Sequence, residues 1–508
     1  MLRLGTSMRC YKPRGEVQSR HEKESEMPIV AEKRGNACGA RGHCYKTRFR
    51  RKEPIRLSEP LQMSPKSQMS DDERVRDFQR RLYQKAKQEV TFRFYSLYDK
   101  IYLPHVLREA YSRCRKKNGA PGIDGKSFAE IEAEGVDEFL KRIGGELREQ
   151  TYKSGMVKRT YIPKANGKMR PLGIPMIKDR VVQMACKMII EPIFEADFED
   201  VSFGFRPKKR AEDAIKKIKE NLKEGLDDIF DADLSAYFDT IPHKELMILV
   251  GKRISDMKVL HLIKMWLKAP VWEDGKISGG KKNKLGTPQG GVISPLLANI
   301  YLHLLDKAVK RIGGHFQRNG VRIVRYADDF VLMARKTAKE SLDYLNKMLA
   351  RMRLKLNIEK SRILNASKEP FDFLGFTFRY DKDLYGRETK YLNIFPSKKS
   401  EKKVWEKIDA YLKGNGHKPP ETIAKELNEI TRGWMQYFHI PGTSYPQKAK
   451  RDLRYYLTRK LYRYYQRKSQ RKCKLYKRGA FEKLKKKYGL IDPAEYLTPK
   501  RLACECFT

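Results

Sequence analysis

Tyr326-Ala327-Asp328-Asp329 lies between two apolar runs, Val321-Arg-Ile-Val-Arg-Tyr326 and Phe330-Val-Leu-Met333, and this stretch decides the fold. Apolar runs on either side of a short polar stretch predict two strands joined by a tight turn. Two adjacent carboxylates at a turn repel one another unless a cation lies between them. Such turns are common, so this one indicates a metal site only if another carboxylate joins it.

A second apolar run supplies that carboxylate. The stretch Ile229-Phe-Asp-Ala-Asp233-Leu-Ser-Ala-Tyr-Phe238-Asp239 predicts a short strand that ends near Asp233, with a helix after Pro242. If this strand lies beside the hairpin in one sheet, Asp233 and Asp328 converge. Carboxylates placed in this way could hold two Mg²⁺ ions, which activate a hydroxyl and hold a leaving group.

Composition indicates a polyanionic partner. The 508 residues include 109 Lys and Arg against 63 Asp and Glu, a net charge of +46. Such a charge favours nucleic acid binding over a merely solvated basic surface. Hydrophobic residues make up 40% of the chain, which excludes global disorder. No apolar run approaches the roughly 20 residues of a membrane span, and the start lacks a signal-peptide stretch, so we expect a cytoplasmic protein.

The N-terminal 72 residues are polar, basic and aperiodic, which predicts a flexible extension. Within it, Cys38, His43 and Cys44 could hold zinc with Cys10, but their spacing matches no zinc module, so free thiols are the favoured interpretation. A helix is expected from Asp71, capped by Ser70.

Other segments predict further elements. The residues 157–168 indicate a basic hairpin with a turn at Asn166-Gly167. From about residue 400 the chain becomes helical, and 447–488 is strongly basic with interleaved tyrosines. Basic residues can position phosphates and tyrosines can stack on bases. The tyrosines could equally form the core stripe of a helix, and both interpretations can hold together.

Ordered motifs show that the chain resembles a bacterial group II intron-encoded reverse transcriptase/maturase. The resemblance runs from about residue 75 to about 470. It is carried by the two carboxylate stretches above and by Gly119-Ala-Pro-Gly-Ile-Asp124-Gly125, Tyr161-Ile-Pro-Lys164-Ala-Asn-Gly-Lys-Met-Arg170-Pro-Leu-Gly-Ile-Pro175, Phe203-Gly-Phe-Arg206-Pro207, Gly286-Thr-Pro-Gln289-Gly-Gly-Val-Ile-Ser-Pro295, Leu354-Lys-Leu-Asn-Ile-Glu-Lys360-Ser361, Phe373-Leu-Gly-Phe376 and Leu427-Asn-Glu-Ile-Thr-Arg432-Gly433-Trp434-Met-Gln-Tyr437-Phe438.

The resemblance implies roles for individual residues. Asp233, Asp328 and Asp329 correspond to the catalytic carboxylates, which bind two Mg²⁺ ions with the main-chain carbonyl of Leu234. An aromatic Phe238 would press on the sugar and exclude a 2′-hydroxyl, although it could also be a core residue. The other residues expected to bind the nucleotide are Lys164, Arg170, Gln289 and Lys360, where Lys360 either protonates the pyrophosphate or only contacts a phosphate.

Nucleic acid contacts are expected on the helical part of the chain and beside the palm. Trp434 and Tyr437 are expected in the core rather than on RNA. The residues predicted to contact RNA or DNA are Arg206, Arg432, Arg459, Lys460 and Arg463.

The implied fold class is α+β, a right-hand polymerase with the fingers and palm of a reverse transcriptase followed by an α-helical thumb/maturase domain. The expected divisions are the extension 1–72, fingers 73–225, palm 226–385, thumb 386–470 and a basic tail 471–508. The last histidine is His439 and few cysteines follow it, so no H-N-H endonuclease is expected.

The implied function is an RNA-directed DNA polymerase that copies its intron RNA and binds that RNA to assist splicing. Its expected partners are group II intron RNA, an RNA template with a DNA primer, dNTPs and target DNA, with no membrane. Two alternatives are a domesticated, retron or defence-type reverse transcriptase and a splicing-only RNA-binding maturase. Intact Asp233, Asp328 and Asp329 argue against the splicing-only maturase.

Overall fold

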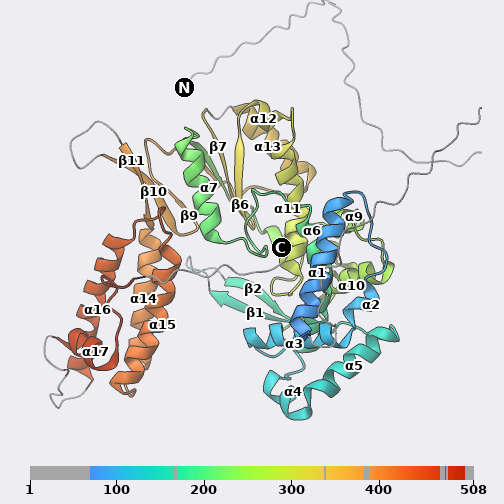
Figure 1. Cartoon of the computed structure of the whole chain (residues 1–508), viewed down its shortest axis with the longest axis horizontal. Coiled ribbons are helices and arrows are strands. Elements are labelled where there is room, and N and C mark those ends of the chain that lie inside the picture. The colour runs from blue at the N-terminus through green and yellow to red at the C-terminus, as the bar shows by residue number, and fades with distance from the viewer. Residues whose placement is uncertain are drawn as a thin grey trace, which may run out of the picture. The chain divides into compact units, whose positions relative to one another are not determined.

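The structure, a computed structural model, describes residues 69–163, 167, 169–336, 339–382, 390–468, 475 and 479–497. Residues 1–68 of the predicted extension 1–72, its cysteine and histidine cluster and Lys164 therefore lie outside the described residues. The predicted boundary is slightly late, because Asp71 and Asp72 already belong to the first helix. Figure 1 shows helices and strands that alternate up to β11, followed by helices alone. This order agrees with the predicted α+β class.

The first helices form a layer around one long buried helix. The capping prediction is confirmed, because Ser70 accepts a hydrogen bond from the Glu73 backbone N–H at 3.3 Å. Nearly every side of α6 is buried, and it packs against α1 and α3 in the largest hydrophobic core. The helices of this layer are α1 (Asp71–Gln88), α2 (Tyr98–Ile101), α3 (Pro104–Lys117), α4 (Phe128–Glu134), α5 (Val136–Arg148) and α6 (Ile177–Glu195).

The predicted basic hairpin is confirmed as the antiparallel pair β1 (Val157–Pro163) and β2 (Met169–Ile174). Its register places Ile162 opposite Arg170, near the tip. β1 also pairs in parallel with β4 (Pro270–Glu273), which turns back into β5 (Lys276–Gly279). The sheet order β2-β1-β4-β5 thus anchors the hairpin to a segment more than 100 residues away.

The central sheet has the order β6-β7-β3-β8. It is sandwiched between two cores, because successive side chains of a strand point to opposite faces. On β7, Phe330 and Leu332 join the first core, whereas Val331 and Met333 join a second core with α7. Its strands are β3 (Asp228–Ala232), β6 (Arg322–Tyr326), β7 (Asp329–Ala334) and β8 (Arg362–Asn365).

Helices cover the sheet and connect its strands. In Figure 1, α7 and α11 stand beside β6, and both contact it. A 3₁₀ turn, η2 (Gly280–Lys282), follows β5. The helices are α7 (Ala211–Lys223), α8 (Tyr237–Thr240), α9 (His243–Gly251), α10 (Met257–Leu267), α11 (Ser294–Lys310), α12 (His315–Arg318) and α13 (Lys339–Arg351).

A small sheet joins the palm to a helical bundle. Its order is β11-β10-β9, and in Figure 1 it lies next to the bundle of α14 to α17. Trp434 packs against both the second core and the core of the bundle, so it links the two. The elements are β9 (Phe371–Phe373), β10 (Phe376–Lys382), β11 (Lys390–Pro396), α14 (Lys398–Gly414), α15 (Pro420–Phe438), α16 (Gln447–Arg467) and α17 (Ala480–Tyr488).

A fully buried ion pair ties α11 to the central sheet. The side chains of Arg325 on β6 and Asp306 on α11 have no exposed surface, and their closest N–O distance is 2.5 Å. The Arg325 guanidinium also donates to Asn299 Oδ1 at 3.0 Å and to the Ala327 carbonyl at 2.8 Å. Its donors are therefore shared between the helix and the turn that carries the adjacent aspartates.

Replacing Asp306→Ala should destabilise the protein strongly, because it leaves Arg325 charged and buried without its partner. A broken buried pair costs about 3–5 kcal/mol, measured as the free energy of unfolding in guanidinium chloride. The control is Glu406→Ala, which breaks the exposed Lys402–Glu406 pair and should cost no more than about 1 kcal/mol. Equal losses in the two variants would contradict the structural importance of the Arg325–Asp306 pair.

Candidate active site

The central sheet brings the three predicted aspartates to one edge. Ala232 pairs with Phe330 in the antiparallel β3–β7 ladder, so Asp233 lies one step beyond the end of β3, beside Asp329. Tyr326 pairs with Asp329 across the β6–β7 turn, which leaves Ala327 and Asp328 as its two central residues. Convergence of Asp233 with the Asp328-Asp329 turn, which the pattern predicted, follows from this register.

The turn that carries Asp328 is held in a constrained conformation. Ala327 adopts a left-handed φ of 60°, which non-glycine residues rarely do and which costs of order 1–3 kcal/mol. The Arg325 guanidinium binds the carbonyl of this same residue. A side chain at Gly204 would meet the Ala327 nitrogen at 2.2 Å, so the Phe203–Pro207 motif needs glycine here to pack beneath the turn.

Asp233 is held by the segment that follows α13. Its Oδ2 accepts from Lys360 Nζ at 2.7 Å and from Asn357 Nδ2 at 3.1 Å. The Asp233 carbonyl accepts from the Asn357 backbone N–H at 2.8 Å. Asn357 was missed by the sequence reasoning, although it lies within the Leu354–Ser361 motif; its position directly after Leu354-Lys-Leu356 was the available signal.

The adjacent bridge leaves a main-chain oxygen for another partner. Leu234 forms an isolated antiparallel bridge with Leu356. The two hydrogen bonds of that bridge use the carbonyls of Asp233 and Lys355. The Leu234 carbonyl is therefore not required by the bridge, which suits its predicted role as a metal ligand.

The carboxylates raise one another's proton affinity. Burial, together with the charges of Asp328, Asp233 and Asp231, raises the pKa of Asp329 to about 7, against a lowering effect of Lys360. Burial also raises the pKa of Asp328, where Asp233 adds to the effect and Arg170 opposes it. A cation at this edge would relieve the repulsion.

The donor set fits a hard divalent cation. Carboxylate and carbonyl oxygens are the ligands that Mg²⁺ prefers. Across the described ranges, no three or more histidine, cysteine, aspartate or glutamate side chains are gathered closely enough to hold a metal. Asp233 Oδ2 instead pairs with Lys360 Nζ at 2.7 Å.

The predicted nucleotide-binding residues lie around the same edge. Arg170 is exposed on β2 and acts electrostatically on Asp328. Gln289 Nε2 donates to Asp239 Oδ2 at 3.4 Å, and the Thr287 N–H donates to the Phe238 carbonyl at 2.7 Å. The loop after β5 is thus joined to α8, where Phe238 is half-buried beside the first core.

The predicted nucleic acid contacts divide into exposed and buried groups. Arg432, Arg459 and Arg463 are exposed on α15 and α16. Arg206, in contrast, has a side chain only 5% exposed and pairs with Glu195 at 2.6 Å, which gives it a supporting role inside the fold. Lys460 pairs with Asp409 of α14 at 2.5 Å, so its charge is used within the bundle.

Trp434 and Tyr437 both contact the region where α15 meets the palm. Trp434 is half-buried, and its ring lies 5.1 Å from that of Phe438, which agrees with the predicted core position. Tyr437 is 40% exposed, and its hydroxyl donates to the Leu374 carbonyl at 2.9 Å. Tyr437 therefore lies at the edge of this contact and not, as was predicted, in the core.

Comparisons with known proteins agree with this geometry. Residues 162–378 match the family described as reverse transcriptase (RNA-dependent DNA polymerase), and residues 401–484 match the group II intron, maturase-specific domain. Protein YkfC of Escherichia coli K12 is 32% identical over 363 residues, which cover 64% of this chain and 93% of YkfC.

Two intron-encoded proteins are also similar. The group II intron-encoded protein LtrA of Lactococcus lactis subsp. cremoris is 32% identical over 362 residues, covering 59% of each chain. The putative COX1/OXI3 intron 2 protein of Saccharomyces cerevisiae is 28% identical over 325 residues, covering 53% of this chain and 37% of that protein. The match to each of these relatives spans less than two thirds of its length.

The fold and the edge of carboxylates define an RNA-directed DNA polymerase that depends on divalent metal ions. With the maturase-specific domain after the palm, the chain belongs to the group II intron reverse transcriptase/maturase family. Neither a defence-type enzyme nor a splicing-only maturase is favoured. Every helix in the described part of the chain is too short or too polar to span a bilayer.

The raised pKa of Asp329 predicts a pH-dependent stability of the metal-free protein. A carboxyl with a raised folded pKa contributes stability that is complete below its ordinary pKa of about 4 and is lost as pH rises through about 7. From pH 5 to pH 8, the melting temperature should therefore fall more for the wild type than for Asp329→Asn. Differential scanning calorimetry in a chelating buffer measures this difference.

The control is Asp343→Asn, which changes an exposed carboxylate on α13. It should follow the wild type at every pH. Saturating Mg²⁺ should reduce the difference between wild type and Asp329→Asn at pH 8, because the cation replaces the proton. Parallel melting curves for wild type and Asp329→Asn would contradict the raised pKa.

Proposed function

We propose that this chain polymerises DNA on an RNA template from a DNA primer and dNTPs, with two Mg²⁺ ions at the central sheet edge. The observation that carries the proposal is the placement of Asp233 beside the Asp328-Asp329 turn by the β3–β7 register. When bound, the two ions would activate the primer hydroxyl and stabilise the leaving pyrophosphate. Asp233, Asp328, Asp329 and the Leu234 carbonyl would hold them.

The surrounding residues bind and orient the nucleotide. Arg170, whose charge opposes the rise in the pKa of Asp328, and Lys164 would contact the triphosphate from the β1–β2 hairpin. Lys360 would exchange its contact with Asp233 for the triphosphate, where its ammonium can give a proton to the leaving group.

We assign the discrimination between deoxyribose and ribose to α8 and to the loop that is hydrogen-bonded to it. The ring of Phe238 would lie against the sugar and leave no room for a 2′-hydroxyl. Gln289, which is anchored near Asp239, would contact the nucleotide close to the sugar. The hydrogen bond between Thr287 and Phe238 keeps these two elements in register.

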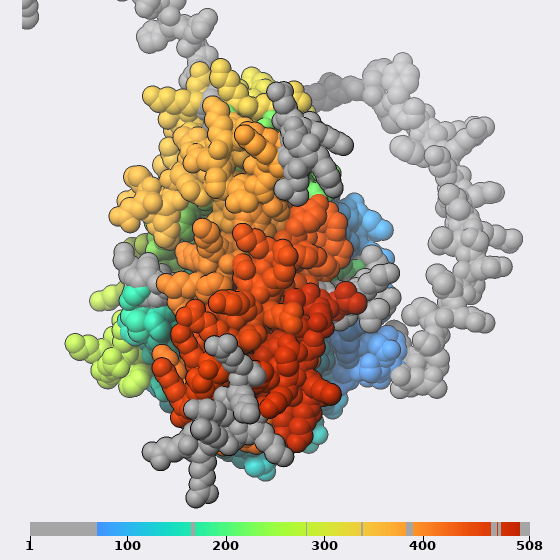
Figure 2. All heavy atoms as spheres, turned by 90° about the vertical axis from the view of Figure 1, so that its left-hand side faces the viewer, coloured from blue at the N-terminus to red at the C-terminus, as the bar shows by residue number. Residues whose placement is uncertain are grey.

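The bundle of α14 to α17 is proposed to bind group II intron RNA as the thumb/maturase domain. Figure 2 shows that residues of the small sheet and the bundle, coloured orange to red, form much of this face. On α16 the exposed side chains include Arg459, Arg463 and Tyr455, which is 69% exposed. Cations beside an exposed aromatic ring suit phosphate contacts and base stacking.

The division into fingers 73–225, palm 226–385 and thumb 386–470 is part of the same proposal. It is supported by the separate core of the bundle. The helix α17 lies beyond residue 470 yet packs against α15 and α16. Contacts with target DNA are proposed for the basic residues near the C-terminal end.

Replacing Asp328→Asn should abolish primer extension. Loss of a metal ligand removes several kcal/mol of transition-state stabilisation, which corresponds to at least about a 100-fold lower rate. The assay is extension of a DNA primer on an RNA template with dNTPs and Mg²⁺. Asp343→Asn serves as the control and should extend at the wild-type rate. Equal rates for wild type and Asp328→Asn would contradict the assignment of the catalytic carboxylates.

Replacing Arg459→Gln together with Arg463→Gln should weaken RNA binding. Two lost phosphate contacts on a structured RNA lower the slope of log affinity against log salt by up to about 1.8. Filter binding to a labelled RNA hairpin at several salt concentrations measures the slope. Lys460→Gln is the matched comparison and should change the slope less, because its charge is paired with Asp409. A larger effect of Lys460→Gln would contradict the proposed face.

A further inference from the structure

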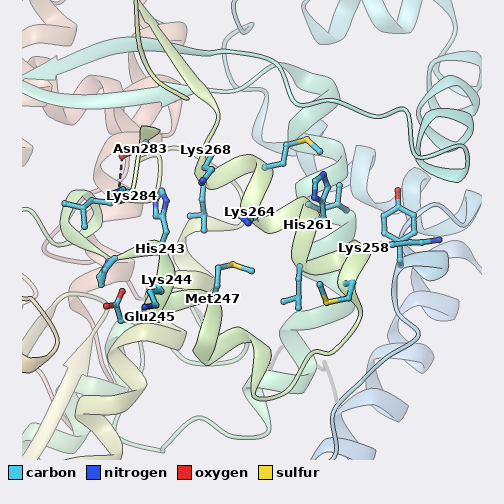
Figure 3. A pocket seen from close by; sticks show the side chains of 18 of the residues that line it. His243, Lys244, Glu245, Met247, Lys258, His261, Lys264, Lys268, Asn283 and Lys284 are labelled. Carbon is cyan, nitrogen blue, oxygen red and sulfur yellow. Dashed lines mark hydrogen bonds between the residues drawn. The ribbon is translucent and has the colours of Figure 1, made fainter. Parts of the chain in front are cut away.

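A large cavity lies between α9, α10 and the loop that follows η2. Its volume is about 980 Å³, and Figure 3 shows labelled side chains of both helices and of the loop around it. It is lined by none of the three catalytic aspartates, nor by Arg170, Gln289 or Lys360. The cavity is therefore distinct from the candidate active site.

Cations surround the cavity. Lysines from three elements line it, and of these Lys244, Lys258, Lys264 and Lys284 are exposed. The carboxylate that lines it, Glu245, is paired with Arg353 at 3.1 Å. The net charge around the opening is strongly positive, so a ligand should carry several negative charges.

The floor of the cavity is apolar. Met247, Leu260 and Met265 line it and are half-buried. Met257, at the start of α10, is 74% exposed, and Leu285 of the loop is 47% exposed. A ligand that satisfies both parts of the cavity needs a flat or apolar group for the floor and anionic groups for the lysines.

His243 ties the cavity wall to the loop. It is only 7% exposed, and its Nε2 lies 2.6 Å from the Gly286 carbonyl. Because a carbonyl can only accept, Nε2 carries the proton. The Nδ1 atom has almost no exposed surface, so His243 supports the wall and does not contact a ligand.

We propose that this cavity binds unpaired nucleotides of an RNA strand, with bases on the apolar floor and phosphates on the lysines. The proposal rests on the proposed function, which requires the chain to bind RNA. Proteins recognise unpaired RNA bases by inserting them among apolar and stacking groups while cations hold the backbone. The net charge of +46 and the proposed RNA substrates favour a polyanionic strand over an acidic amphipathic peptide.

Backbone hydrogen bonds connect the wall of the cavity to the nucleotide-binding loop. The His243 N–H donates to the Lys284 carbonyl at 3.0 Å, and the Gly286 N–H donates to the Ile241 carbonyl at 2.8 Å. The same loop continues to Thr287, which binds Phe238. RNA bound in the cavity would therefore restrict the movement of the loop that carries Gln289.

The test is photocrosslinking of the full chain to a single-stranded RNA 15-mer that contains 4-thiouridine, followed by peptide mapping. We expect crosslinks within residues 243–265 or 283–285. Lys244→Gln with Lys264→Gln should lower these crosslinks at least about fivefold and reduce the salt slope of binding by about 1.4, at about 0.7 for each single-strand contact. Both lysines are exposed, so the variant should fold normally.

The control is Lys141→Gln with Lys347→Gln, which removes two exposed lysines that do not line the cavity. It should leave the cavity crosslinks unchanged. Three results would overturn the proposal: wild-type crosslinks confined to other segments, an equal loss in both double variants, or occupation of the cavity by an acidic amphipathic peptide probe but not by the RNA.

Primer extension separates this proposal from the proposed function. Both double variants should extend a DNA primer on an RNA template at rates within about twofold of the wild type, because the lysines lie outside the active site. Failure of the wild type to extend would contradict the polymerase, whereas normal extension without cavity crosslinks would contradict the cavity proposal alone.

Discussion

The buried contact between Arg325 and Asp306 is the constraint on which the active site depends. A guanidinium without exposed surface is stable only if its donors are satisfied, and here Asp306 and Asn299 of α11 and the Ala327 carbonyl satisfy them. The same group thus fixes the helix on the sheet and the strained turn above it. The position of Asp328 therefore depends on Arg325 and Asp306, which are buried behind the turn and do not face the active site.

The active site is an acidic centre in a basic protein. The chain has a net charge of +46, yet Asp231, Asp233, Asp328 and Asp329 act on one another at one edge. Lys360 and Asn357 both donate hydrogen bonds to Asp233 Oδ2. The basic surroundings attract the nucleic acid, and the acidic edge supplies carboxylate oxygens for the divalent metal ions on which the polymerase depends.

Local sequence patterns predicted the fold, because short stretches of apolar and turn-forming residues specify its strands and turns. The apolar runs around Asp328 gave the hairpin, and Ser70 gave the first helix cap. Such local patterns do not indicate which side chains of distant elements pair with each other. Arg206 and Lys460 were expected on nucleic acid, but Glu195 and Asp409 neutralise them, and nothing near either basic residue indicates its partner. The cavity was missed for the same reason, since α9, α10 and a loop form it jointly.

The shared packing at Trp434 has a consequence for how the chain can be divided. Phe438 at the end of α15 lies 4.8 Å from Phe376 of the small sheet and belongs to the palm core. A fragment that ends before α15 would present Phe376 and its neighbours to water, on a sheet with unpaired edges. Such a surface favours self-association. The maturase segment of this chain is therefore also a structural cover for the small sheet, and the polymerase part cannot be cut away from it without new polar residues on that sheet.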